Sequence, residues 1–127
     1  MCPMKSLVLI IEDQPLHAKF FAEVFRSAGL ASVTALTGSD GLIVAKAAVP
    51  ELIIVDLRLP DKPGHEVIAE LRCCPNNHAV PIIAITAAVE REAETSSLVA
   101  GANVFLTKPV RVSRLETEVK KLLQPAR

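Results

Sequence analysis

The sequence predicts an α/β fold in which a parallel sheet is covered by helices on both faces. Five short runs of branched apolar residues start about 20–30 residues apart, and helix-length amphipathic segments separate them. Continuous apolar runs are typical of strands buried on both faces, and regular alternation of strand and helix favours a parallel sheet. The predicted strands are Leu7–Ile11, Ser32–Leu36, Leu52–Val55, Ile82–Ile85 and Val104–Leu106.

The first two predicted helices carry clear start or stop signals. Pro15–Ala28 begins with a proline and is followed by Gly29, the usual order of these residues at the two ends of a helix. Its apolar residues recur at spacings of three and four, so one face of this helix is expected to be buried. The second helix covers about Asp40–Ala48, with Thr37 or Ser39 as its N-terminal cap.

Three further helices follow from the same periodicity. His65–Cys73 presents an apolar face, and Glu90–Ala100 is the least apolar of the predicted helices. Val112–Leu123 has a strong apolar stripe, and Ser113 and Glu116 near its start have the spacing of a capping box.

Composition excludes several classes of protein. The chain has 127 residues and carries 14 basic and 14 acidic side chains, so its formal net charge is zero. A chain of this length forms one domain, and zero net charge argues against nucleic-acid binding, which normally needs a basic excess. Apolar residues make up 50% of the chain, too much for a disordered protein. We expect a single domain over residues 1–127, with its core at about residues 5–124.

Nothing in the sequence predicts secretion or insertion into a membrane. The first apolar run, Leu7–Ile11, is too short for a signal peptide. The longest mostly apolar run, Ala79–Val89, has eleven residues, and about 18 are needed to span a bilayer. Cys73, Cys74 and His78 do not have the spacing of a zinc site, and an odd number of cysteines does not suggest a disulfide framework. We expect a soluble cytoplasmic protein.

Polar side chains stand at the ends of four predicted strands. Glu12 and Asp13 follow the first strand, Asp56 the third and Thr86 the fourth, and Lys108 stands at the end of the fifth. Ligands of open parallel sheets bind beyond the carboxyl ends of the strands. We therefore expect these five side chains to gather at one rim of the sheet.

The charges at this rim favour a divalent cation. Three clustered carboxylates carry a charge of −3, which a divalent cation and the Lys108 ammonium would neutralise together. Oxygen ligands with open positions suit Mg²⁺. A carboxylate beside Mg²⁺ and a lysine can attack a phosphoryl group and form an aspartyl phosphate.

These residues resemble the motifs of response regulator receiver domains, which act in two-component signalling and have the chemotaxis-regulator fold. The resemblance covers nearly the whole chain and implies a flavodoxin-like (βα)5 sheet with strand order 2-1-3-4-5. The matching pieces, which occur in the family's order, are Glu12–Asp13, Asp56 within the segment Val55–Gly64, Thr86–Ala87 and the segment Gly101–Pro109.

The resemblance implies a role for each residue of the rim. Asp56 corresponds to the phosphoacceptor. Asp13 would bind Mg²⁺ directly, Glu12 largely through water, and Asp56 and the backbone carbonyl of Arg58 would complete the protein ligands. Lys108 would pair with the phosphoryl group.

A conformational switch is also implied by the resemblance. Thr86 corresponds to the switch hydroxyl and Phe105 to the switch aromatic, although a fixed core aromatic is the alternative reading of Phe105. Phosphorylation would remodel the face formed by Glu90–Ala100, Val104–Leu106 and Val112–Leu123.

Partners follow from the same resemblance. The phosphoryl donor would be a sensor histidine kinase or a histidine phosphotransfer protein, and the output would be contact with a downstream protein target. We expect no output domain, no direct contact with nucleic acid or membrane, and a monomer or weak dimer. Such a protein is not a classical enzyme, although it catalyses its own phosphorylation and some autodephosphorylation.

Other functions fit the residues less well. A phosphorylation-independent, receiver-like interaction module is the main alternative. A haloacid-dehalogenase-type phosphatase usually needs a second acid two residues after Asp56, where Arg58 stands. In a flavodoxin-like electron carrier, Glu12 and Asp13 would repel the phosphate of the cofactor. We expect the three histidines to be surface residues outside the site: His17, His65 and His78.

Overall fold

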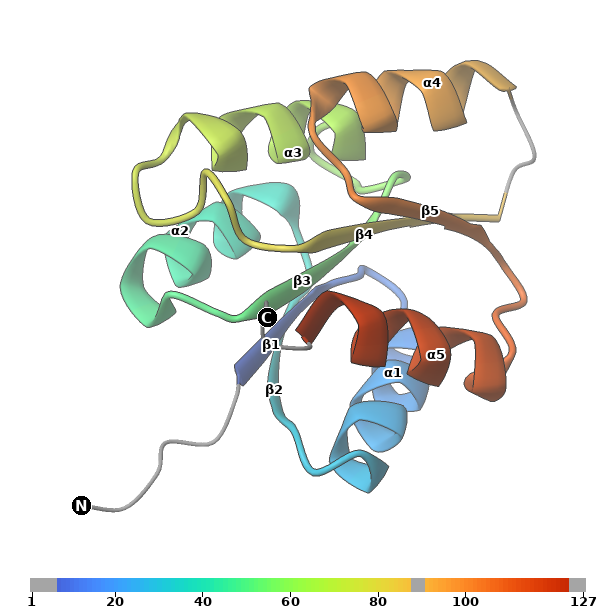
Figure 1. Ribbon diagram of the computed structural model, residues 1–127. Coiled ribbons are helices and arrows are strands. Elements are labelled where there is room, and N and C mark those ends of the chain that lie inside the picture. The colour runs from blue at the N-terminus through green and yellow to red at the C-terminus, as the bar shows by residue number, and fades with distance from the viewer. Residues whose placement is uncertain (1–6, 88–90, 124–127) are drawn as a thin grey trace.

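The computed structural model describes residues 7–87 and 91–123, in which strands and helices alternate along the chain (Figure 1). The strands are β1 (Leu7–Ile11), β2 (Ala31–Ala35), β3 (Leu52–Asp56), β4 (Ile82–Thr86) and β5 (Val104–Thr107). The helices are α1 (Pro15–Ser27), α2 (Gly38–Ala48), α3 (Gly64–Cys73), α4 (Arg91–Ala100) and α5 (Val112–Leu123).

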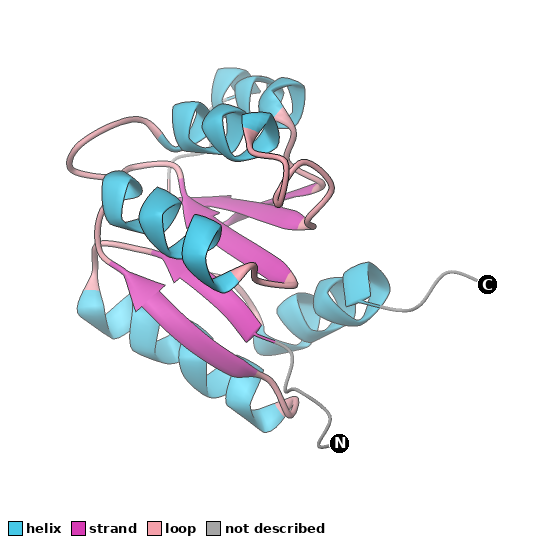
Figure 2. Ribbon diagram, turned by 90° about the vertical axis from the view of Figure 1, so that its left-hand side faces the viewer, coloured by secondary structure: helices cyan, strands magenta, loops and turns pink. Residues whose placement is uncertain are grey.

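The strands form one parallel sheet in the order β2-β1-β3-β4-β5. Figure 2 shows this sheet between layers of helices. The predicted fold class, a doubly wound, flavodoxin-like α/β sheet with strand order 2-1-3-4-5, is confirmed. The strand order reverses between β1 and β3, and the crevice at such a reversal is where ligands of this architecture bind.

Two apolar clusters form the core, one on each face of the sheet. Because successive side chains of a strand point to opposite faces, each strand contributes to both clusters. Ile10, Ile54 and Leu106 belong to the cluster under α1 and α5. Val55 and Ala84 belong to the cluster under α2 and α3, on the other face. These assignments also fix the face to which the residues at the strand ends point.

The observed element boundaries lie within two residues of the predicted ones wherever both can be compared. The predicted start of α4 at Glu90 lies outside the described residues. The capping box predicted at Ser113 is wrong, because the Leu115 N–H donates to the Arg111 carbonyl at 3.0 Å and Arg111 therefore holds the cap position. Among the described helices, none has the length and apolar character needed to cross a membrane.

Two side chains satisfy backbone donors at the start of α2. Thr37, one of the two predicted caps, accepts a hydrogen bond from the Asp40 N–H at 3.0 Å. The Asp61 carboxylate, from the loop between β3 and α3, accepts hydrogen bonds from the N–H groups of Gly38 at 2.8 Å and Ser39 at 2.9 Å. These backbone hydrogen bonds lower the pKa of Asp61 to about 2. The loop that follows β3 is thereby tied to α2.

Gly64 allows this loop to close tightly. Its N–H donates to the Leu57 carbonyl at 3.0 Å. A Cβ atom at residue 64 would lie 2.5 Å from the Leu57 Cα and 2.7 Å from the Asp56 carbonyl oxygen, both closer than real contacts allow. The start of α3 can therefore pack against the end of β3 only because residue 64 has no side chain.

The Thr37 cap makes a testable contribution to stability. We expect Thr37→Ala to lower the free energy of unfolding by about 1 kcal/mol, since the Asp40 N–H loses its acceptor. Thr37→Ser retains the hydroxyl and should stay close to wild type. Urea denaturation of the three proteins measures the difference, and equal losses for both variants would contradict the capping role.

Candidate functional site

Strand alternation brings three charged side chains to the same face of the sheet. Glu12 follows Ile10 by two positions, Asp56 follows Ile54, and Lys108 follows Leu106. Since side chains two residues apart share a face, all three continue the apolar cluster that faces α1 and α5. The polar site therefore lies at the carboxyl ends of the strands, directly beyond the buried apolar cluster on the same face of the sheet.

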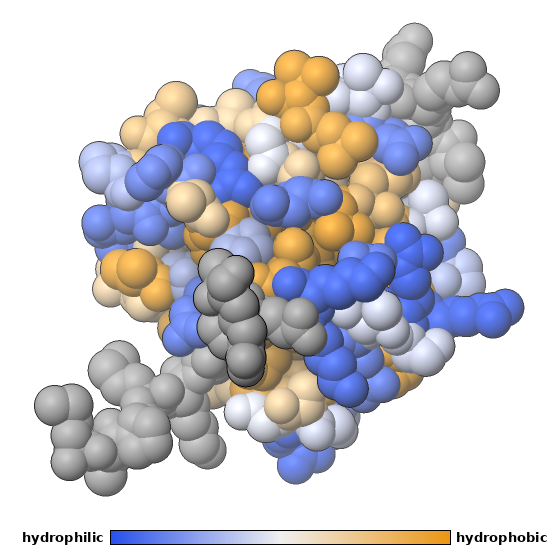
Figure 3. Space-filling model, viewed as in Figure 1, coloured by the Kyte–Doolittle hydropathy of each residue, from blue (hydrophilic) through white to orange (hydrophobic). Residues whose placement is uncertain are grey.

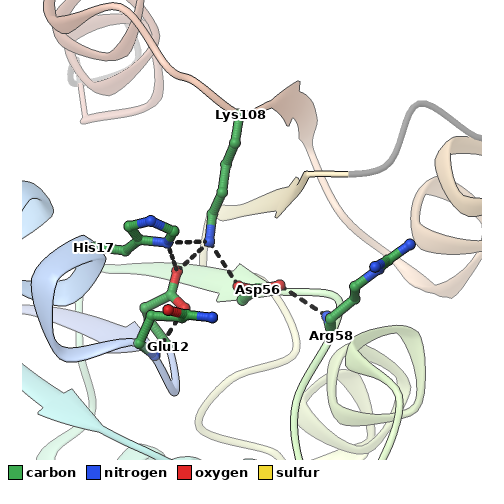
Figure 4. Close-up of polar contacts among 6 residues, drawn as sticks. Glu12, His17, Asp56, Arg58 and Lys108 are labelled. Atoms are coloured by element: carbon green, nitrogen blue, oxygen red, sulfur yellow. Dashed lines mark hydrogen bonds and ion pairs between the residues drawn. The ribbon is translucent and has the colours of Figure 1, made fainter.

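Lys108 joins the two acids in a bridge (Figure 4). Its Nζ lies 2.7 Å from Glu12 Oε1 and 2.8 Å from Asp56 Oδ2. The side chains of Glu12, Asp56 and Lys108 are only 1%, 6% and 13% exposed. The backbone holds Lys108 in place, because its N–H donates to the Thr86 carbonyl at 2.8 Å; the Lys108–Pro109 peptide bond is cis.

Burial and proximity shift the pKa values of two of these groups. The pKa of Glu12 is raised from 4.5 to about 7, mainly because the carboxylate is buried. The hydrogen bond from Lys108 acts in the opposite direction, and the neighbouring Asp56 adds to the rise. Burial also tends to lower the pKa of Lys108, but its hydrogen bonds to Asp56 and Glu12 outweigh this effect and raise the pKa overall. The ammonium thus stays charged at neutral pH.

Three acids at this rim can share a cation. Glu12, Asp13 and Asp56 each offer a carboxylate oxygen, and these oxygens lie within 4.8 Å of one another. Hard oxygen donors, one of them on the half-exposed Asp13, suit a divalent cation that keeps some of its water, such as Mg²⁺. The donor set and its spacing therefore fit Mg²⁺.

Arg58 contacts Asp56 through its backbone. The Arg58 N–H donates to Asp56 Oδ1 at 2.8 Å, so both oxygens of Asp56 accept hydrogen bonds. Figure 4 shows the Arg58 side chain extending away from the Lys108 ammonium. The hydrogen bond from Arg58 to Asp56 thus comes from the backbone, and the predicted role of the Arg58 carbonyl as a ligand stays a prediction.

His17 was expected to lie outside the site, and this expectation is wrong. Its Nδ1 lies 2.9 Å from Lys108 Nζ and 3.9 Å from Glu12 Oε1 (Figure 4). The sequence did carry a signal, because Pro15 starts α1 two residues after Asp13. A side chain in the first turn of α1 is thereby kept close to the end of β1.

The two predicted switch residues lie on the other face of the sheet. Thr86 follows Ala84 by two positions, and Ala84 belongs to the cluster under α2 and α3. Phe105 pairs with Ala84 in the strand register and packs against the same cluster. Thr86 is 2% exposed and Phe105 is half-buried. The charged bridge and the predicted switch pair thus face opposite helix layers.

The family is settled by comparison with known proteins. A model described as the response regulator receiver domain matches residues 8–120. The chain belongs to this family. Receiver domains are signalling modules of two-component systems, and in general they interact with histidine kinases or phosphotransfer proteins and with downstream targets.

Two response regulators are similar to this chain over nearly its whole length. The polar-differentiation response regulator DivK of Brucella ovis is 29% identical over 123 residues, which cover 97% of this chain and all of that protein. A putative response regulator from Chloroflexus aurantiacus is 29% identical with a TM-score of 0.90, and the match covers 94% of this chain and 98% of that one.

One structural neighbour was solved with a metal. The receiver domain of a sensor histidine kinase from Pseudomonas aeruginosa has a magnesium ion coordinated in its active-site cleft. It is 28% identical to this receiver domain with a TM-score of 0.86, and the match covers 94% of this chain and 98% of that one.

The raised pKa of Glu12 predicts a pH-dependent stability of the metal-free protein. Between pH 4.5 and about 7, the folded state binds a proton at Glu12 that the unfolded state releases, so stability falls as the pH rises through this window. We expect a loss of up to about 3 kcal/mol. Glu12→Gln should remove this component. Urea denaturation at pH 5 and 7.5 with a chelator provides the test, and identical pH dependence of both proteins would contradict it.

Proposed function

We propose that Asp56 accepts a phosphoryl group from the phosphohistidine of a sensor histidine kinase or histidine phosphotransfer protein. The observation that carries the proposal is the Lys108 bridge between Glu12 and Asp56 at the strand-order reversal. A carboxylate oxygen of Asp56 would attack phosphorus, the phosphorus–nitrogen bond of the donor would break, and the donor imidazole would take up a proton.

Glu12, Asp13, Asp56 and the backbone carbonyl of Arg58 would hold Mg²⁺ in this proposal. When bound, the cation supplies positive charge that stabilises the oxygens of the phosphoryl group. Lys108 contributes a second positive charge, from an ammonium that already lies 2.8 Å from Asp56 Oδ2. Once Asp56 is phosphorylated, this ammonium can donate to a phosphoryl oxygen without leaving its place.

Output would pass through the face formed by α4, β5 and α5. A hollow of about 680 Å³ lies there and is lined by residues of all three elements, among them Glu94, Phe105 and Arg114. Figure 3 shows apolar surface at α4 and over the middle of this side, next to the polar surface of α5. Thr86 and Phe105 would shift this face when the phosphoryl group adds charge-assisted contacts at the rim.

The chain would act as one receiver domain that signals through protein contacts. Support comes from the match over residues 8–120, which includes both clusters of the core and every residue of the site. A phosphorylation-independent, receiver-like interaction module would have the same fold, so phosphorylation itself is the property to test.

Phosphorylation can be tested with a small phosphodonor. We expect the wild-type protein, with acetyl phosphate and Mg²⁺, to gain one phosphoryl group by intact-mass spectrometry and to shift the backbone amide signals of Thr86 and Phe105. Asp56→Asn should do neither, because the attacking carboxylate is gone. Asp40→Asn, which removes an exposed acid in α2, is the matched control and should behave as wild type. An unmodified wild-type protein would leave the phosphorylation-independent module as the better explanation.

Magnesium binding provides a separate test. The chain has no Trp or Tyr, so an NMR titration is better suited than intrinsic fluorescence. We expect Asp13→Asn to weaken Mg²⁺ binding by at least about tenfold, since a charged oxygen ligand is lost. Asp40→Asn should not change the affinity. Equal affinities of wild type and Asp13→Asn would exclude Asp13 as a ligand.

A further inference from the structure

We propose that His17 is a positioning residue that holds the Lys108 ammonium in place through Nδ1. This inference rests on the proposed phosphorylation of Asp56. It starts from the 2.9 Å separation of Lys108 Nζ and His17 Nδ1, a contact that the roles assigned to the three acids do not require.

The chemistry of the two groups determines the direction of this hydrogen bond. A lysine ammonium has three N–H donors and no acceptor. Glu12 and Asp56 take two of these donors, at 2.7 and 2.8 Å. Nδ1 of His17 must therefore accept the third, which places the imidazole proton on Nε2. With His17 in place, every donor of Lys108 has a partner.

His17 differs from the other two acceptors in what happens during the reaction. Asp56 would become an acyl phosphate, and Glu12 would turn toward the bound cation and its water. Both carboxylates would therefore change their contact with Lys108 when the site fills. His17 takes no part in either event, so its contact can persist throughout. A long, flexible lysine gains most from such a fixed acceptor.

The backbone under His17 is well anchored. Ala18 and Phe21 on the same helix are only 4% and 3% exposed and pack in the cluster under α1 and α5. The Ala18 N–H donates to the Gln14 carbonyl at 2.9 Å, which fixes the first turn of α1. The imidazole itself is 47% exposed, so it can be replaced without opening a cavity in the core.

Three variants separate positioning from a general structural effect. His17→Ala removes the acceptor, His17→Asn offers an amide oxygen in its place, and His78→Ala removes an exposed histidine from the loop between α3 and β4. With acetyl phosphate and Mg²⁺, we expect His17→Ala to be phosphorylated roughly tenfold more slowly than wild type. His17→Asn should return to within about twofold, and His78→Ala should match wild type.

A double-mutant cycle and an NMR signal test whether the effect of His17 on phosphorylation passes through Lys108. In a Lys108→Ala background, His17→Ala should cause no further slowing, because there is no ammonium left to position. The Lys108 side-chain ammonium signal in ¹⁵N NMR should be observable in wild type and broadened by exchange in His17→Ala. Three results together support the proposal. His17→Ala slows phosphorylation, it causes no further slowing in the Lys108→Ala background, and it broadens the ammonium signal of Lys108.

Each other result overturns it. Unchanged rates in His17→Ala, an unchanged ammonium signal, or equal slowing with and without Lys108 would each show that His17 does not position Lys108. Such results in a wild-type protein that is phosphorylated would leave the proposed function intact. If the wild-type protein accepts no phosphoryl group, the proposed function fails, and this inference fails with it.

Discussion

The ammonium of Lys108 between Glu12 and Asp56 is the interaction on which the site depends. Both carboxylates are almost fully buried, and a buried charge without a partner is strongly unfavourable. Lys108 offsets part of this negative charge from a position 96 residues beyond Glu12 in the chain. In the strand order, β4 separates β5 from β3 and β1, so this bridge is a direct link from the end of β5 to the ends of β1 and β3. The ion pairs of Lys108 therefore connect the carboxyl end of β5 to those of β1 and β3, which strand pairing connects to β5 only through β4.

Side chains along a strand point alternately to the two faces of the sheet, so the residues of the site fall into two groups. One set of positions carries the charged bridge toward α1 and α5, and the other carries Thr86 and Phe105 toward the opposite layer of helices. Lys108 contacts both sets, because its ammonium binds Asp56 and its N–H donates to the Thr86 carbonyl. Under the proposed function, charge added at Asp56 would therefore act on Lys108. The backbone N–H of Lys108 is hydrogen-bonded to the carbonyl of Thr86, the predicted switch residue.

The sequence was sufficient for the fold and for the acidic rim, and insufficient for contacts that depend on side-chain placement. Continuous apolar runs located every strand, and the carboxyl ends of parallel strands must meet at one edge, so Asp56 and Lys108 could be brought together without coordinates. His17 was missed because its contact with Lys108 depends on how α1 packs against the sheet. Ser113 was misassigned as a cap because Arg111, a poor capping residue, holds that position.

The two ends of the sheet are held by different kinds of interaction. At the amino ends of β4 and β5, Arg72 donates to the carbonyls of Gly101 and Val80 and to Asn103 Oδ1, which also accepts the Ile82 N–H. This network joins α3 to the loops before β4 and β5. The opposite end is held by the bridge of Lys108 with Glu12 and Asp56, whose charge balance would change under the proposed function. Packed cores transmit shifts rather than absorb them, so under the proposed function a change at Asp56 would be passed to a sheet that is held by this network at its far end.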